Sequence, residues 1–264
     1  MRLFIMSIIL VASLVAKDFT SRYDVNIGMF GTIGYIDMIV KEDENSYEMS
    51  IVAKTIGTVA TLTKDRKELF TSKGKIVDGK YIPDVFVKTR TTNYKSRVQT
   101  YVFNHETKKI TMTQNESKLV SSTSFDPIAF KIISKENIEK STKVKVLDTY
   151  DVNDVLSIYL NAKMDCNSNL KEYPLLAVGA KNDKNDVTLT FLDGADKKDV
   201  IASFSNDTKN IYNLHVKPND KDKETVDILV AFDNDGHMKE AYLGDIFWVG
   251  EVRAKRVYKR LSAN

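Results

Sequence analysis

The chain has 264 residues, of which 42% are hydrophobic and 28% are charged, as is ordinary for a globular protein. Its 39 basic and 36 acidic residues leave a net charge of +3, which gives no reason to expect nucleic acid as a partner. The single cysteine, Cys166, excludes an internal disulfide, so stability has to come from the hydrophobic core. Because secreted eukaryotic proteins of this size usually carry several disulfides, the composition favours a bacterial protein.

The first element is an apolar run that follows Arg2 and ends at Ala16. One positive charge, about a dozen apolar residues and a small final residue are typical of a secretory signal peptide. The run is shorter than the roughly 20 apolar residues of a membrane-spanning helix. We therefore expect a signal peptide over residues 1–16, cleavage between Ala16 and Lys17, a periplasmic location, and a mature chain over 17–264 without a transmembrane segment.

Apolar and polar residues alternate in the first half of the mature chain, which is the pattern of half-buried antiparallel strands. Short turns rich in Gly, Asn and Asp separate these strands, so consecutive hairpins should form a meander. We expect the following residues to face the core: Tyr23, Val25 and Ile27; Tyr47, Met49, Ile51 and Ala53; Val98, Thr100 and Val102; Ile110 and Met112.

Two segments have helical spacing instead. Apolar residues recur every three positions within 55–66, and an apolar stripe runs through 151–164, where Asp151 is placed to cap the N-terminus. The Ser- and Thr-rich stretch 117–130 is a candidate joint between two packed halves. Strands are expected again over residues 175–179, 187–192, 212–217, 226–232, 237–243 and 248–258. Asp235-Gly236 predicts a hairpin turn between the strands over 226–232 and 237–243.

These elements predict an all-β fold class with two short helices. The sheet should be a curved antiparallel meander, either an open half-barrel or barrel-like, in a single β-rich domain over residues 17–264. Glycines at positions 28, 31 and 34 have the spacing G-x-x-G-x-x-G between two strands, which indicates a hairpin and not a nucleotide-binding loop.

The sequence indicates no catalytic, cofactor-binding or metal-binding residues. Ser72 and Lys75 satisfy the pattern S-x-x-K, but its usual companion motifs are missing and Gly74 disfavours a helix. The three histidines lie far apart in the sequence, whereas zinc sites need clustered ligands.

Several patterns occur in a fixed order: Tyr23-x-Val25-x-Ile27-Gly28-x-Phe30-Gly31-x-Ile33-Gly34, then Ala53-Lys54-Thr55-x-Gly57, then Ser72-x-Gly74 with Gly79 and Pro83, then Asp154-Val155-Leu156-Ser157-x-Tyr159. Together they resemble a family of exported bacterial proteins, the domain of unknown function 3108, over most of the mature chain. The resemblance implies an envelope location and a curved antiparallel β structure, similar in architecture to the open half-barrels that carry lipoprotein acyl chains. It supplies no catalytic residues.

The leading hypothesis is a non-enzymatic periplasmic protein whose curved sheet binds a lipid or another hydrophobic or amphiphilic ligand, or supports assembly of the cell envelope. Such a ligand would need an adaptable apolar lining, although these residue types are more often plain core. The candidate lining residues are Met29, Phe30, Met38, Met49 and Met112.

Two alternatives stay open. A structural envelope protein that binds a protein partner should present an exposed apolar patch or an unpaired edge strand. A hydrolase of envelope polymers would need two carboxyl groups that face each other in one cleft. The carboxylates considered for this role are Asp37, Glu48 and Glu68.

Overall fold

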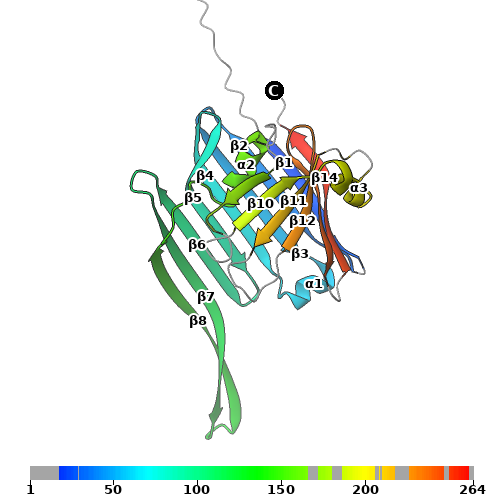
Figure 1. Ribbon diagram of the computed structural model, residues 1–264. Coiled ribbons are helices and arrows are strands. Elements are labelled where there is room, and N and C mark those ends of the chain that lie inside the picture. The colour runs from blue at the N-terminus through cyan, green and yellow to red at the C-terminus, as the bar shows by residue number, and fades with distance from the viewer. Residues whose placement is uncertain are drawn as a thin grey trace, which may run out of the picture.

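The computed structural model, shown in Figure 1, describes residues 18–28, 30–165, 172–179, 186–205, 208, 210–217, 226–246 and 250–261. Within these ranges the first half of the chain forms β1 (Phe19–Ile27), β2 (Gly31–Glu42), β3 (Ser46–Thr55), α1 (Gly57–Leu62), β4 (Lys67–Val77), β5 (Lys80–Thr91), β6 (Lys95–Asn104), β7 (Lys109–Asp126) and β8 (Lys131–Val146). The second half forms α2 (Ser157–Asp165), β9 (Glu172–Leu176), β10 (Asp186–Phe191), α3 (Gly194–Ile201), β11 (Asn210–Lys217), β12 (Val226–Phe232), β13 (Met238–Ile246) and β14 (Gly250–Leu261).

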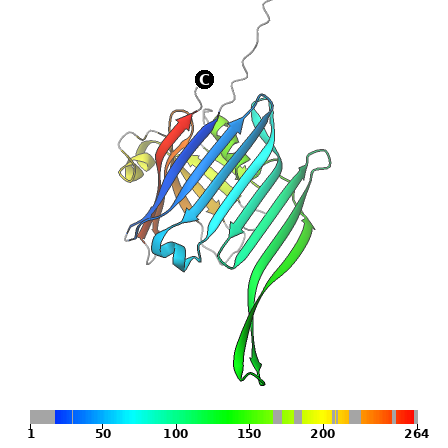
Figure 2. The same ribbon diagram turned by 180° about the vertical axis from the view of Figure 1, so that it is seen from behind.

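All fourteen described strands belong to one antiparallel sheet, in the order β8-β7-β6-β5-β4-β3-β2-β1-β14-β13-β12-β11-β10-β9. Strands that are adjacent in the sheet are also adjacent in sequence, except where the first strand pairs with the last, from Phe19 opposite Leu261 to Ile27 opposite Val252. The sheet curls over on itself, as Figures 1 and 2 show from opposite sides, and stays unclosed with β8 and β9 as its edges. The predicted all-β fold class and meander are confirmed.

The glycine hairpin between β1 and β2 is confirmed. Gly31 has a φ of +65°, in the left-handed region that glycine adopts without strain. A Cβ atom at Gly34 would lie 2.5 Å from the backbone oxygen of Lys54, so the backbones of β2 and β3 approach too closely there for any side chain. The predicted turn at Asp235-Gly236 likewise joins β12 to β13.

Two helix predictions and one strand prediction need correction. Helix α2 begins at Ser157 and not at Asp151, because Asp154 is the residue that caps it. Helix α3 was not predicted, since its eight residues are too few to show a clear apolar stripe. The strand expected over 175–179 lies earlier, as β9, and Val178 makes only an isolated bridge with Asp154.

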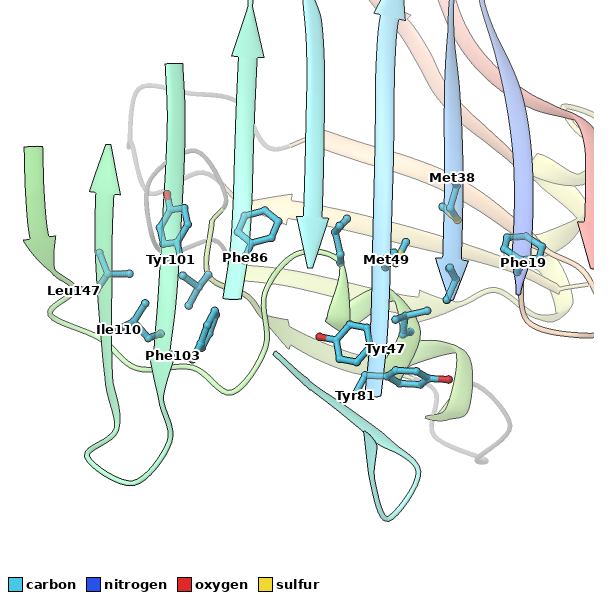
Figure 3. Close-up of a cluster of buried hydrophobic side chains, with 14 of the residues drawn as sticks. Phe19, Met38, Tyr47, Met49, Tyr81, Phe86, Tyr101, Phe103, Ile110 and Leu147 are labelled. Atoms are coloured by element: carbon cyan, nitrogen blue, oxygen red, sulfur yellow. The ribbon is translucent and has the colours of Figure 1, made fainter. Parts of the chain in front are cut away.

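The buried core lies on one face of β1 to β7, which we call the inner face; it carries alternate side chains such as Tyr23, Met49 and Phe86. Figure 3 shows buried side chains of successive strands, among them Met49, Phe86 and Tyr101. The segment after β8 packs against them through Leu147, Leu156 and other apolar residues. Among the described helices, none has the length and apolar character needed to cross a membrane.

The prediction for β6 is wrong about which side faces the core. Tyr101 and Phe103 are buried on the inner face, whereas Val102 on the other side is 49% exposed. The aromatic residues occupy the inner face because they bury more apolar surface than valine or threonine. Arg97 and Gln99 also lie on the inner side, and polar residues in an alternating strand predict a side that faces solvent.

The hairpin of β7 and β8 extends beyond the rest of the sheet. Pairing between β6 and β7 ends at Lys95 opposite Lys118, whereas β7 and β8 remain paired up to Asp126 opposite Lys131. Residues 120–137 therefore form a two-stranded ribbon, which we call the arm, and Figures 1 and 2 show it projecting away from the body. The stretch 117–130, considered above as a joint, lies in this hairpin.

Candidate ligand site on the inner face

Strand pairing places inner-face side chains in rows that run across the sheet. In one row, Phe19, Val40, Met49, Ser72, Phe86, Tyr101 and Met112 lie side by side, and a nearby row contains Tyr23, Ile36, Ala53, Glu68, Arg90, Arg97 and Glu116. Directly opposed side chains in such rows have Cβ atoms about 5 Å apart. The inner face of β4 to β7 thus has an aromatic end, near Phe86 and Tyr101, and a charged end, near Arg90 and Arg97.

The aromatic end is filled by the chain itself. Phe86 contacts Tyr101 with ring centroids 5.7 Å apart, and a Cβ atom at Gly179 would lie only 2.2 Å from the ring of Phe86. Asn161 of α2 accepts a hydrogen bond from the backbone nitrogen of Tyr81 and donates one to its oxygen, at 2.9 and 3.0 Å. These two hydrogen bonds attach helix α2 to the backbone of β5.

A buried polar network holds the start of α2 against β3 and β4. The Asp154 carboxylate accepts hydrogen bonds from the backbone nitrogens of Leu156 and Ser157, as an N-cap does. It also accepts one from the Ser72 hydroxyl at 2.5 Å, and that hydroxyl lies 2.8 Å from the hydroxyl of Tyr47. Burial raises the pKa of Asp154 to about 6, although its hydrogen bonds act in the opposite direction.

The charged end consists of two clusters around carboxylates. Glu68 accepts a hydrogen bond from Arg90 at 2.6 Å and another from Arg66. Burial alone would raise the pKa of Glu68, but the two guanidinium groups outweigh it and lower the pKa. Glu116 pairs with Lys95 at 2.5 Å and with Arg97 at 2.8 Å. These arginines remain 37% to 43% exposed, so their outer nitrogens can still meet a ligand.

Lys88 lies between the two clusters, opposite Phe70 and Gln99. Within the part of the chain that the structure describes, its ammonium forms no ion pair, and it lies over the Phe70 ring, 5.5 Å from the ring centroid. Burial lowers the pKa of Lys88, and the surrounding arginines lower it further although Glu68 opposes them. The charged end thus has three more cations than carboxylates.

A cavity of about 220 Å³ adjoins the charged end. It is lined by apolar groups of β1 to β3, by Arg66 and by Glu68. Its lining includes Gly34 and Ala53, whose small size leaves the space open. The volume is below the roughly 300–1,000 Å³ of typical ligand pockets, so the cavity fits one narrow apolar group, not a whole lipid.

The residues predicted to line a ligand site do not come together around this cavity. Met38 and Met49 are buried in the core, and Met112 packs against it. Phe30 is 55% exposed in the turn before β2. Met29 lies outside the described residues, as do Ala16 and Lys17 at the expected cleavage site.

The three carboxylates considered for catalysis are not brought together either. Asp37 forms a bidentate ion pair with Arg22, and Glu48 pairs with Lys73, both on the outer face of the sheet. Glu68 lies on the inner face.

Ser72, the serine of the S-x-x-K pattern, is fully buried in a strand. Among the described residues, no three His, Cys, Asp or Glu side chains gather as metal ligands would.

The residues of the charged end were not predicted as a site. Arg97 is a polar member of an alternating strand, and polarity in such a strand predicts a side that faces solvent. The only available signal was the sequence Tyr101-x-Phe103 on the same side as Arg97 and Gln99. Two aromatic residues in phase with the charged ones indicate that this side faces inward.

Comparison with known proteins gives a family and no activity. No curated protein matches the chain. Among solved structures, the chain is similar to the "Crystal Structure of Beta-barrel-like Protein of Domain of Unknown Function DUF1849 from Brucella abortus", with a TM-score of 0.44 and 13% identity over 95% of this chain and 99% of that one. Residues 22–134 match the model of the family described as "Protein of unknown function (DUF3108)". This match supports the resemblance noted in the sequence over that segment, which is less than half of the chain.

Proposed function

We propose that the chain is an exported periplasmic protein that binds, without catalysis, an amphiphilic ligand with an anionic headgroup. The observation that carries the proposal is the row from Tyr23 to Glu116, which changes from apolar to charged across the inner face, with Lys88 adding a positive charge beside its arginines. An amphiphile has the same division, with an apolar tail beside a charged group.

The headgroup would lie at Lys88, because its ammonium lacks the carboxylate partner that Arg66, Arg90 and Arg97 have among the described residues. A half-buried ammonium surrounded by guanidinium groups is destabilised until a negative charge approaches it. Arg90 and Arg97 flank it on β5 and β6 and can each offer a second nitrogen to a phosphate or carboxylate. The attraction of each cation to an anion bound there would offset the repulsion among the cations.

The tail would enter the cavity beside Glu68. Arg66 and Glu68 line this cavity and also form the nearer of the two charged clusters, so headgroup and tail sites are continuous. The lining by Val25, Ile36 and Ala53 supplies the apolar surface that a hydrocarbon requires. The cavity's size predicts preference for one short chain, or for the end of a longer one.

A non-enzymatic role is supported by the positions of the acidic groups. Asp37 and Glu48 are neutralised on the outer face, and Glu68 accepts hydrogen bonds from two arginines. Asp154, whose pKa is raised to about 6, is fully buried and caps α2. Among the described carboxylates, none is therefore placed at the charged end as a poised general acid.

The test is a calorimetric titration of the purified protein with dodecyl phosphate, and in parallel with inorganic phosphate and with dodecyltrimethylammonium. We expect dodecyl phosphate to bind, inorganic phosphate to bind at least tenfold more weakly, and the cationic amphiphile not to bind. Lys88→Met should lower the affinity for dodecyl phosphate about tenfold, which is the value of one charge-assisted contact of about 1.4 kcal/mol.

Lys73→Met is the matched control, because Lys73 lies on the neighbouring strand but on the outer face, paired with Glu48. Ala53→Leu should weaken binding of the dodecyl chain by filling the cavity, and should leave the binding of inorganic phosphate unchanged. Equal binding of both amphiphiles by the parent protein, or equal losses with Lys88→Met and Lys73→Met, would refute the anionic headgroup site.

Export is tested separately by expressing the full chain in a bacterium and measuring the mass of the protein released by osmotic shock. We expect the loss of residues 1–16, and retention in the cytoplasm when Leu10→Arg interrupts the apolar run. Native mass spectra of the released protein should also show a co-purified acyl species. A full-length mass in the cytoplasmic fraction would contradict the periplasmic location.

A further inference from the structure

The arm carries its apolar side chains at its far end. Phe125, Ile128, Phe130 and Ile132 are between 56% and 97% exposed, and we call these four residues the tip. The rings of Phe125 and Phe130 contact each other edge to face with centroids 5.4 Å apart. Nearer the body the arm changes character, since residues 121–124 are Ser-Ser-Thr-Ser. Exposed apolar side chains gathered at one point indicate a contact surface.

Backbone N–H groups in the turn of the tip have hydrogen-bond acceptors within the turn. The carboxylate of Asp126 accepts hydrogen bonds from the backbone nitrogens of Ile128 and Ala129, at 2.9 and 3.0 Å. Pro127 has no backbone N–H to satisfy. The turn can therefore enter an apolar medium without exposing these donors to it, which is the condition that a bilayer imposes on any inserted backbone.

The charges near the tip favour an anionic surface. Residues 120–137 contain two acidic residues, Asp126 and Glu136, and two basic residues, Lys131 and Lys135. The carboxylate of Asp126 already accepts two hydrogen bonds within the turn, whereas Lys131 directly follows Phe130, so Lys131 is the charge at the tip that can meet a lipid headgroup. A shallow apolar insertion beside a lysine is attracted to anionic lipid headgroups.

A partner that adds a strand to the arm fits the same features less well. Strand addition uses the whole length of an edge, whereas the apolar side chains of the arm are concentrated at its end. The edge strand β8 carries Lys135, Glu136, Glu139 and Lys140, and such charges oppose edge pairing.

We propose that the tip inserts into the interfacial region of an anionic lipid bilayer, and that the arm holds the body away from that surface. Residues 120–126 extended as a strand span roughly 23 Å, which sets the separation. The arm leaves the body two residues after Glu116, so it projects from the charged end of the inner face. This inference stands without the proposed ligand site.

The test is co-sedimentation of the purified protein with vesicles of phosphatidylcholine containing about one third phosphatidylglycerol. We expect the double substitution Ile128→Ser and Phe130→Ser to lower the vesicle-bound fraction at least tenfold. Leu62→Ser is the matched control, because Leu62 is 74% exposed on α1, away from the arm, and its loss should leave binding unchanged. Urea unfolding should give the same midpoint for all three proteins, since both changes lie in exposed positions.

Insertion itself is measured with Ile128→Trp, whose fluorescence should shift to shorter wavelength and be quenched by brominated lipid beyond the signal of the parent protein. Failure of the parent protein to sediment with the vesicles would overturn the proposal. Self-association that the double substitution abolishes, in the absence of vesicle binding, would also overturn it and would assign the tip to a second copy of the chain.

Discussion

The aromatic and charged ends of the inner face are built from the same strands, yet the chain treats them in opposite ways. At the aromatic end, Phe86 and Tyr101 are covered by α2 and by Gly179. At the charged end, four residues further along β5 and β6, Arg90 and Arg97 stay partly exposed. The covered end stabilises the fold, whereas the open end keeps more cations than carboxylates. A single β-strand therefore contributes to the core at one end and to the proposed binding site at the other.

The largest expected effect is at the aromatic end. Phe86→Ala removes a fully buried ring, so the free energy of unfolding should fall by about 3–5 kcal/mol in urea titrations. Val102→Ala, on the outer face of the neighbouring strand, should cost less than about 1 kcal/mol. Equal costs for the two substitutions would show that the inner face is not the core.

The second prediction concerns pH and the cap of α2. Because the pKa of Asp154 is raised to about 6 in the folded chain, the folded state holds a proton between pH 4 and 6 that the unfolded state has lost. The contribution of this group to stability is therefore complete at low pH and falls by roughly 3 kcal/mol as the pH rises to 6. Urea unfolding at several pH values should show this component in the parent protein and not in Asp154→Asn. An identical pH profile for both would contradict the assignment.

The third prediction concerns the attachment of α2 to β5. Asn161→Ala leaves the backbone groups of Tyr81 without their side-chain partner, which should cost about 1–3 kcal/mol. Hydrogen exchange should speed up at the amide of Tyr81. A loss of stability with unchanged exchange at Tyr81 would place the effect elsewhere.

The smallest expected effect on stability is at the charged end. Lys88→Met removes a half-buried ammonium that has no carboxylate partner among the described residues, so stability should change by less than about 1 kcal/mol, and any change should be an increase. The same substitution should lower the affinity for dodecyl phosphate. A large loss of stability would mean that Lys88 holds the fold together and is not reserved for a ligand.

Local patterns in the sequence predicted the fold class, the glycine hairpin and the turn at Asp235-Gly236, because each depends on neighbouring residues. The side of β6 that faces inward was not predictable by the rule that polar residues face solvent, since Arg97 and Gln99 share the inner face with Tyr101. The cap at Asp154 is partly local, but its contact with Ser72 joins residues 82 positions apart. Neither that contact nor the cluster around Lys88 is visible until the strands are paired.

The pairing of the first strand with the last has a consequence for biogenesis. Ser21 donates a hydrogen bond to the backbone oxygen of Tyr258, which lies 237 residues later in the chain. Contacts of such sequence separation form late and slow folding, because the intervening loop must be ordered first. During synthesis, β1 therefore keeps one edge unpaired until β14 has been made. Until then, that unpaired edge is exposed to pairing with other chains.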